Sequence, residues 1–551
     1  TLIWSVGVVI VNPIGDFPLN DDWSFGLAVQ YFMQRGSFHP TGWTAMTLLT
    51  NVIWGSLFCL PQGFSFTALR FSTLAASWLG VLGAYWLVRK LGQPRSVALL
   101  AGFTLAFNPL YFVLSNTFMT DVPCLTLMIF SAIFFLENLK NDSLPALTAA
   151  IFLSLAAILS RQVGLAVPLA FALVTIAARG FKARVLGFAL APTILGIAVL
   201  AGFQYWMKIS GILPKAYTDD SGKLFRTLIQ ILFHPAEGFP SLVHRVYACL
   251  VPTGLFLSPL LLLAGPAFGR STGKVWAGAG IILLSLAGLL AFYRHAGMSF
   301  MVPLAGNNLS VWGLGPLTLR DAFYLSGNPL PLLPRAIYVV ATVMGLVGGT
   351  LLIYRTCSFL RHVFSRPAFP MNWDYEAQAG VFLLLISVIY MGQTILGALF
   401  DRYLVPIIPF LTGFLVLFRS QDELRFKSIR YAMILATILG FSIFSVCGTR
   451  DYLAWNRARW EALDNLMSEE QVKPQNIDGG FEFNGFYLYN PGYQNTPGKS
   501  RWWVVDDTYL ITFKPILGYS ILHDYHYTHW MPPYTGNIYV LQRDAAAHPG
   551  K

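Results

Sequence analysis

Charged residues are scarce in this sequence. Only 11% of its 551 residues are Asp, Glu, Lys or Arg, whereas a soluble domain carries about 25%. Hydrophobic residues make up 55% of the chain, and its mean hydropathy is +0.57. This composition excludes an ordinary soluble domain and is typical of a protein that crosses the membrane many times.

Several functional signatures are also missing. The five cysteines show no CxxC spacing, so we expect neither a disulfide framework nor a cysteine zinc site. No HExxH, GxSxG, P-loop or GxGxxG motif stands in a strand–helix context, which argues against soluble nucleotide and hydrolase chemistry. The net charge of +11 does not predict a nucleic-acid partner, because Lys and Arg gather in short segments between apolar runs.

Apolar segments dominate the rest of the chain. A span needs about 20 apolar residues, and about thirteen segments are candidates, the first of them the end of a truncated span. The candidates are 1–12, 65–88, 96–114, 121–137, 144–160, 163–179, 184–206, 241–264, 275–293, 335–354, 376–398, 403–418 and 430–447.

The connections between these segments predict an orientation. If the spans alternate, five connections rich in Lys and Arg share one side, which the positive-inside rule assigns to the cytoplasm. These basic connections are 89–95, 178–184, 270–274, 354–366 and 419–430. The longer segments 13–64, 207–240, 294–334 and the tail from 448 then lie on the opposite, external side.

The tail is polar, aromatic and rich in Gly and Asn. Its pattern predicts a helix over 451–468 and short strands that include "RWWVVDD" (501–507) and "NIYVLQR" (537–543). About a hundred residues suffice for a small domain. We therefore expect an all-α membrane domain over 1–447 and an external α+β domain over 448–551.

An acidic doublet, Asp21 and Asp22, follows the first span. The spacing of apolar residues predicts an amphipathic helix over 22–35 that ends before Gly36. Asn20 or Asp21 can cap this helix, and Asp22 can complement its dipole. Because one Asp is enough for a cap, the doublet is also a candidate for chemistry.

Three further ionisable residues stand at span ends on the external side. Asp121 in "FMTDVP" can begin a helix, but an acid flanked by so much apolar sequence is also a candidate functional residue. Arg161 in "LSRQVGL" has no evident partner, and a phosphate would satisfy it. Arg402 follows Asp401, which offers a local salt bridge as a structural alternative.

Together these motifs resemble those of the GT-C glycosyltransferases, in the branch of the protein O-mannosyltransferases and the lipid A aminoarabinose transferases. The segments that carry the resemblance, in order, are "NDDWSFGLAVQYFMQRG", "FMTDVP", "LSRQVGLAVP" and "DRYLVPIIP". They cover roughly 1–180 and 395–415. The doublet is Asp-Asp where the branch carries an Asp-Glu type, which leaves open which carboxylate is the base.

The resemblance implies a GT-C-like fold with external loop helices, and an inverting transfer of a sugar from a polyprenyl-phosphate donor. The acceptor would be a hydroxyl of a lipid, glycan or protein. The implied location is a bacterial inner (plasma) membrane, with the active site facing the periplasm or exterior.

The same resemblance implies roles for the residues. Asp21 is the leading base, with Asp22 its neighbour or substitute, and Asp121 positions a sugar. Arg161 and Arg402 bind the donor phosphate, which leaves without needing a proton but needs positive charge. A divalent cation at the doublet stays open, and no other metal site is expected.

Two other functions remain as alternatives. A flippase for lipid-linked sugars would also need charges within its spans, although the chain shows no paired half-helices or symmetric halves. The tail could instead be a sugar- or peptidoglycan-binding module, for which about thirteen spans are a large anchor.

Overall fold

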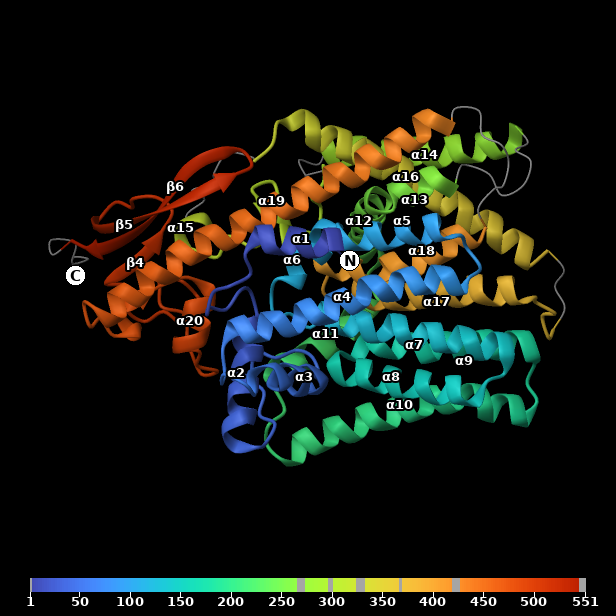
Figure 1. Cartoon of the computed structure of the whole chain (residues 1–551), viewed down its shortest axis with the longest axis horizontal. Helices are drawn as coiled ribbons and strands as arrows, with labels where there is room; N and C mark the ends of the chain where they lie inside the picture. Colours follow the sequence, from blue (N-terminus) through green and yellow to red (C-terminus); the bar gives the residue numbers. More distant parts are fainter. Residues whose placement is uncertain are drawn as a thin grey trace.

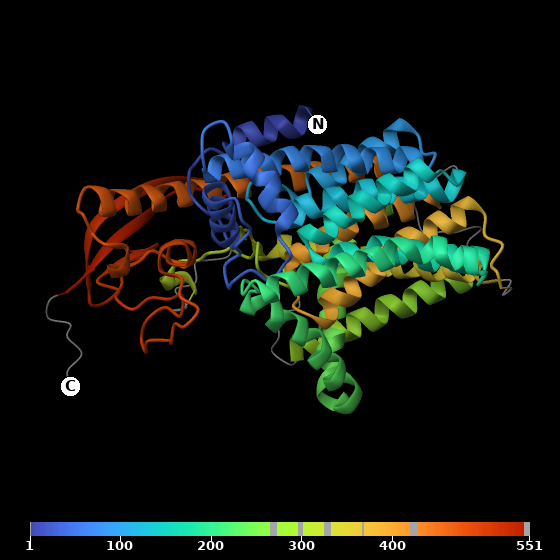
Figure 2. The same ribbon diagram turned by 90° about the horizontal axis from the view of Figure 1, so that it is seen from below.

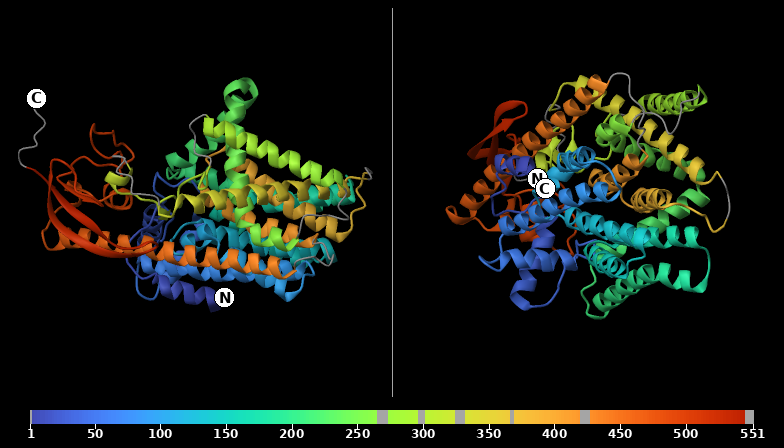
Figure 3. Two further views of the ribbon diagram at one scale, coloured as in Figure 1. Left: turned by 90° about the horizontal axis from the view of Figure 1, so that it is seen from above. Right: turned by 45° about the vertical axis from the view of Figure 1, so that its right-hand side comes forward.

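The computed structural model describes residues 2–264, 273–295, 301–323, 332–365, 369–418 and 427–544. A bundle of long helices forms most of the molecule, and a small sheet domain lies at one end of it (Figure 1). Views from below and above show the same division (Figures 2 and 3). The predicted fold class, a helical membrane protein with a small C-terminal sheet domain, is confirmed.

The helices before residue 265 form the larger part of the bundle. They are α1 (Leu2–Val11), α2 (Asp22–Arg35), α3 (Leu49–Cys59), α4 (Phe66–Lys90), α5 (Arg95–Ala106), α6 (Pro109–Ser115), α7 (Asp121–Asn141), α8 (Leu144–Ser160), the 3₁₀ turn η1 (Gln162–Leu165), α9 (Ala166–Arg179), α10 (Ala183–Ile209), α11 (Lys215–Phe233), α12 (Pro235–Phe256) and α13 (Ser258–Ala264).

The later elements complete the bundle and build the sheet domain. They are α14 (Gly273–His295), β1 (Leu309–Ser310), β2 (Gly313–Leu314), α15 (Arg320–Phe323), α16 (Arg335–Val363), α17 (Tyr375–Leu396), η2 (Asp401–Ile407), α18 (Ile408–Leu417), α19 (Lys427–Ser468), η3 (Pro474–Asn476), β3 (Ile477–Asp478), α20 (Phe481–Leu488), β4 (Tyr509–Thr512), β5 (Tyr519–Trp530) and β6 (Pro533–Arg543).

Every predicted span falls on a helical segment. In the described part of the chain, seven helices are long and apolar enough to cross a membrane, or up to nine if two bent pairs each count as one span. The bent pairs are α5 with α6, at 65°, and α12 with α13, at 67°. Of three shorter apolar helices, α1 and α8 account for further predicted spans, and α3 lies within the segment 13–64 that was predicted to be external.

The break between α5 and α6 has a local cause. Proline cannot continue a helix and restricts the residue before it, and Pro109 opens α6. The Asn108 side chain then accepts the backbone N–H groups of Leu110 and Tyr111, both at 3.1 Å. One predicted span is therefore two helices at an angle.

The predicted helix over 22–35 is confirmed. Helix α2 spans Asp22–Arg35, and Gly36 follows with a φ of 67°. The backbone N–H of Gly36 donates to the carbonyl of Phe32 at 2.8 Å, which closes the last turn.

Helix α19 joins the bundle to the sheet domain (Figure 1). The sequence predicts a span over 430–447 and a separate helix over 451–468, but one helix of 42 residues covers both. Gly448 does not end it, because a single helical glycine costs only about 1 kcal/mol. The predicted domain boundary at 447/448 therefore falls inside a continuous helix.

The sheet has the strand order β3-β4-β6-β5. Strand β6 contains the predicted segment 537–543, but 501–507 forms no strand. Within that segment Trp503 has a φ of 63°, which a strand does not tolerate. Instead Trp502 and Trp503 pack in a cluster with Trp23 and Phe481.

The two ends of the molecule differ in charge. The basic connections 89–95 and 178–184 lie at the end of the bundle that is far from the sheet domain (Figures 1 and 2). Most of 270–274 and 419–430 lies outside the described residues. This arrangement agrees with the orientation expected from the sequence, in which the basic connections and the C-terminal domain lie on opposite sides.

Candidate active site

The two acids of the doublet bind different partners. Asp22 is buried, and its carboxylate accepts the backbone N–H of Leu19 and, at 3.0 Å, that of Phe118. Burial raises the pKa of Asp22 from 3.8 to about 7, against the opposing effect of these hydrogen bonds and of Arg70. Asp22 thus holds the segment before α7 against the start of α2.

Asp21 keeps part of its side chain accessible, at 18% exposed. Its Oδ2 accepts both terminal N–H groups of Arg402 at 3.1 Å, and its Oδ1 accepts the Trp43 indole N–H at 3.0 Å. Asp21 stands at the N-cap position of α2, but its side chain makes no capping hydrogen bond. Capping is therefore the wrong explanation for this carboxylate.

The local pairing of Arg402 with Asp401 is also wrong. The Asp401 carboxylate accepts backbone N–H groups, among them that of Leu309 at 2.6 Å and that of Asn308 at 2.9 Å. The side chain of Arg402 reaches instead to Asp21, 381 residues away in the sequence.

Arg161 is not unpaired. Its guanidinium donates to Asp121 Oδ1 at 2.9 Å and to Thr120 Oγ1 at 3.0 Å, and both members of the ion pair are buried. Asp121 is the first residue of α7, and Arg161 follows the end of α8. The pair therefore ties together two neighbouring helices at the same end of the bundle.

Tyr403 connects the two ion pairs. The guanidinium carbons of Arg161 and Arg402 lie 5.1 Å and 5.4 Å from the centre of its ring, within the range of a cation–π contact. Asp21, Arg402, Tyr403, Arg161 and Asp121 thus form one chain of contacts, which we call the Asp–Arg array.

Four of the five predicted site residues meet in this array, and Asp22 lies beside it. Sequence reasoning missed Tyr403 and Trp43. Tyr403 directly follows Arg402, so its place in "DRYLVPIIP" was the available signal. No signal in the sequence marked Trp43, because its contact with Asp21 depends on how the first loop folds.

The array leaves two buried polar atoms without a hydrogen-bond partner among the described residues, Asp121 Oδ2 and Arg402 Nε. Buried polar atoms are nearly always satisfied. A ligand with both hydroxyl donors and phosphate acceptors, such as a sugar phosphate, could donate a hydrogen bond to Asp121 Oδ2 and accept one from the Arg402 Nε–H.

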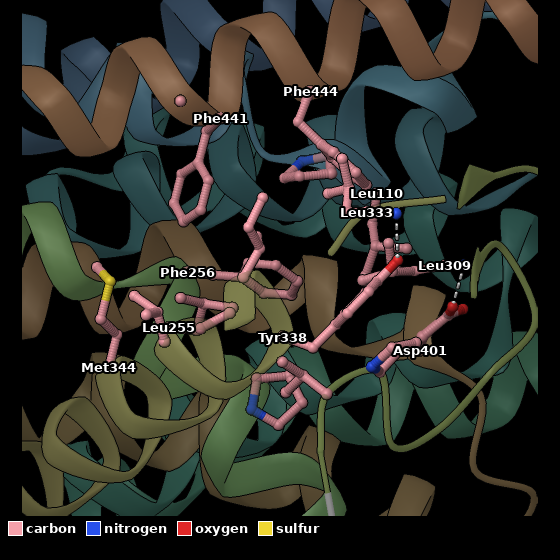
Figure 4. Close-up of a pocket in the computed structure, with 18 of the residues that line it drawn as sticks. Leu110, Leu255, Phe256, Leu309, Leu333, Tyr338, Met344, Asp401, Phe441 and Phe444 are labelled. Atoms are coloured by element: carbon pink, nitrogen blue, oxygen red, sulfur yellow. Dashed lines mark hydrogen bonds between the residues drawn. The ribbon is translucent and has the colours of Figure 1, made fainter. Parts of the chain in front are cut away.

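Two cavities flank η2. A cavity of about 340 Å³, here called the polar cavity, is lined by Arg161, Tyr403 and Gln393 among others. A second cavity of about 550 Å³, the apolar cavity, lies between α12, α16 and α19 (Figure 4). Phe256, Met344 and Phe441 are among the side chains that line it, and Asp401 lies at one side.

A divalent cation does not fit the doublet as it is folded. Both oxygens of Asp22 accept backbone N–H groups, and both oxygens of Asp21 accept side-chain N–H groups. Within the described ranges, no group of three or more His, Cys, Asp or Glu residues could hold a metal ion.

Residues 48–206 match the sequence model of a family described as dolichyl-phosphate-mannose-protein mannosyltransferase. This segment is therefore similar to a membrane glycosyltransferase. The predicted resemblance to the GT-C glycosyltransferases is thereby confirmed. The segment includes Asp121 and Arg161 of the array, whereas Asp21 and Arg402 lie outside it. No curated protein matches the chain at a significant level.

Solved structures of the glycosyltransferase ArnT from Cupriavidus metallidurans resemble the whole chain. The apo structure and the structure bound to undecaprenyl phosphate each show 14% identity and a TM-score of 0.41, and the match covers 100% of this chain and 99% of theirs. The oligosaccharyltransferase AglB from Archaeoglobus fulgidus, in complex with an inhibitory peptide and a dolichol-phosphate, shows 12% identity and a TM-score of 0.36, over 91% of this chain and 61% of that one. At these levels of similarity, we transfer no residue role from them.

Proposed function

We propose that this integral membrane protein is an inverting glycosyltransferase that uses a polyprenyl-phosphate-linked sugar and an acceptor hydroxyl. The Asp–Arg array carries the proposal, because it pairs one partly accessible carboxylate, Asp21, with the buried guanidinium of Arg402. Tyr403 links Arg402 to a second buried guanidinium, that of Arg161. The family match over 48–206 supports the same class of reaction.

Asp21 is the base in this mechanism. The acceptor oxygen attacks the anomeric carbon and gives its proton to the Asp21 carboxylate. The bond between the anomeric carbon and the phosphate oxygen breaks, and its electron pair stays on the phosphate. Asp22 is a poorer candidate because it is buried, with 1% of its surface exposed, whereas the Asp21 side chain is 18% exposed.

The two arginines bind the leaving phosphate. Guanidinium groups in a dry, preorganised site stabilise the developing negative charge. Arg161 lines the polar cavity and is held there by one oxygen of Asp121, while the other oxygen has no hydrogen-bond partner in the described part of the chain. Asp121 thus orients Arg161 and can accept a hydroxyl of the sugar with its second oxygen.

The apolar cavity suits the prenyl chain of such a donor. Its lining is almost wholly aliphatic and aromatic, and it adjoins η2, which carries Arg402 and Tyr403 (Figure 4). We place the array on the external side of a bacterial plasma membrane, because the basic connections lie at the opposite end of the bundle. The acceptor is a lipid, glycan or protein hydroxyl.

The proposal predicts that Asp21→Asn abolishes transfer. The full chain would be reconstituted in liposomes with polyprenyl-phosphate-linked mannose, glucose or aminoarabinose, and release of free polyprenyl phosphate would be measured. Loss of a general base lowers the rate by about 10²–10⁴-fold. Asp524→Asn, the same change at an exposed site in β5, is the control.

Unchanged turnover in a folded Asp21→Asn protein would contradict the mechanism. Movement of the intact labelled donor across the liposome, without release of polyprenyl phosphate, would show a flippase instead.

A further inference from the structure

The sheet domain holds the residue that precedes the doublet. Asn20 has a φ of 59°, in the left-handed region that non-glycine residues rarely adopt. Its backbone N–H donates to Glu482 Oε1 at 3.0 Å. Glu482 belongs to α20, which lies beside α2 although 462 residues separate the two partners (Figure 1).

Glu482 is itself fixed by buried partners. Its Oε2 accepts the Arg459 guanidinium at 2.8 Å and the Thr318 hydroxyl at 2.6 Å, and the side chains of Glu482 and Arg459 are wholly buried. Arg459 comes from α19 and also donates to the carbonyl of Gly479 at 2.9 Å. A buried ion pair contributes little net stability, whereas three directed hydrogen bonds define one position for the carboxylate.

The neighbours of Glu482 hold the other side of the doublet. Phe481 packs edge-on against Trp23, with ring centres 6.2 Å apart, and a side chain at Gly485 would collide with the same indole. Phe481 also contacts Trp43, the indole that donates to Asp21, at 5.8 Å. Helix α20 thus contacts the residues before and after the doublet, and also Trp43, one of the two residues that donate hydrogen bonds to Asp21.

We infer that Glu482 is a positioning residue for the base, and that the sheet domain is therefore a structural part of the active site. The inference rests on the proposed role of Asp21. Glu482 touches no reacting atom. It keeps Asn20 in its left-handed conformation, so that the Asp21 carboxylate faces Arg402.

The first test compares Glu482→Gln with the control Glu461→Gln, the same change at an exposed position of α19. Glutamine keeps an acceptor for Asn20 but loses the charge that binds Arg459. A misplacement of about 1 Å can cost about 100-fold in rate, so we expect kcat to fall by about that factor while KM for the donor stays unchanged. Thr318→Val, a milder change in the same network, should act in the same direction.

A second measurement does not depend on transfer. The thiol introduced by Asp21→Cys would be labelled with a membrane-impermeant maleimide, with the parent chain as the background for the five native cysteines. In a protein that combines Asp21→Cys with Glu482→Gln, the thiol should be labelled several-fold faster than in Asp21→Cys alone, because residue 21 is no longer held in place. If no tested sugar is transferred, the proposed function fails, and labelling alone decides the role of Glu482.

Two results would overturn the inference. One is unchanged kcat and unchanged labelling in folded Glu482→Gln and Thr318→Val proteins. The other is a loss of transfer that is fully explained by a smaller amount of folded protein, while the folded fraction is labelled at an unchanged rate.

Discussion

At the scale of single residues, the doublet contains two carboxylates in different surroundings. Asp22 accepts only backbone N–H groups and is buried, whereas Asp21 accepts only side-chain N–H groups and remains partly accessible. Adjacent residues point in different directions at a helix start, because one precedes the first turn and the other begins it. The doublet therefore combines a structural acid with a candidate base.

The raised pKa of Asp22 predicts a pH-dependent stability. The folded protein holds this proton up to about pH 7, whereas the unfolded chain releases it near 3.8. The contribution of Asp22 to stability is therefore fully present below 3.8 and is lost as the pH rises towards 7. As the pH rises between these two values, the unfolding temperature of the unaltered protein should fall relative to that of Asp22→Asn.

This prediction is checked by thermal unfolding of both proteins in detergent at pH 4.5, 6 and 7.5. A constant difference between them across this range would show that Asp22 is not protonated in the folded state.

At the scale of elements, the short η2 turn organises the site. Its residues face three places: Asp401 and Leu404 line the apolar cavity, Arg402 reaches Asp21, and Tyr403 lines the polar cavity. A 3₁₀ turn of about three residues per turn distributes consecutive side chains around its axis. One short segment can thereby separate the apolar cavity from the Asp–Arg array.

Filling the apolar cavity should impair donor binding. Gly440 in α19 lines this cavity, and a Cβ at this position would meet open space, so that Gly440→Phe can add a large side chain to the cavity wall without a clash at its Cβ. We expect a higher KM for a long-chain polyprenyl donor and no loss of thermal stability. Gly202→Phe is the matched control, because Gly202 in α10 is also open but lines neither cavity. Equal KM values for the two variants would contradict the assignment of the prenyl chain to this cavity.

At the scale of the whole molecule, α19 and α20 connect the sheet domain to the site. Helix α19 runs from the bundle to the sheet and supplies Arg459, which binds Glu482 (Figure 1). Helix α20 then packs against the start of α2. The domain is therefore coupled to the bundle by buried ionic and aromatic contacts rather than by a flexible linker.

Gly485→Ala tests this coupling. A Cβ at Gly485 would lie 2.3 Å from the Trp23 ring, which must then move. Overpacking of this kind costs about 1–3 kcal/mol, so the unfolding temperature and the transfer rate should both fall. Gly187→Ala in α10 meets open space and should change neither. A stable and fully active Gly485→Ala protein would show that the contact between α20 and Trp23 is dispensable.

Much of the fold was predictable because it follows from local chemistry. Apolar runs mark the helices, Gly36 ends α2 where a positive φ is needed, and Asp121 and Arg161 stand out as ionisable residues in apolar sequence. The strand predicted over 501–507 was wrong because its aromatic residues pack against Trp23, a partner from the other end of the chain.

The sequence by itself determined which segments are helical, which acids and arginines are candidates for the site, and the class of enzyme that the chain resembles. These properties depend on hydropathy, charge and short motifs. Only the tertiary structure decided the partners: Arg402 with Asp21, Arg161 with Asp121, and Asn20 with Glu482. Such pairs join helices that are distant in sequence, and no local propensity specifies which buried charge will meet which.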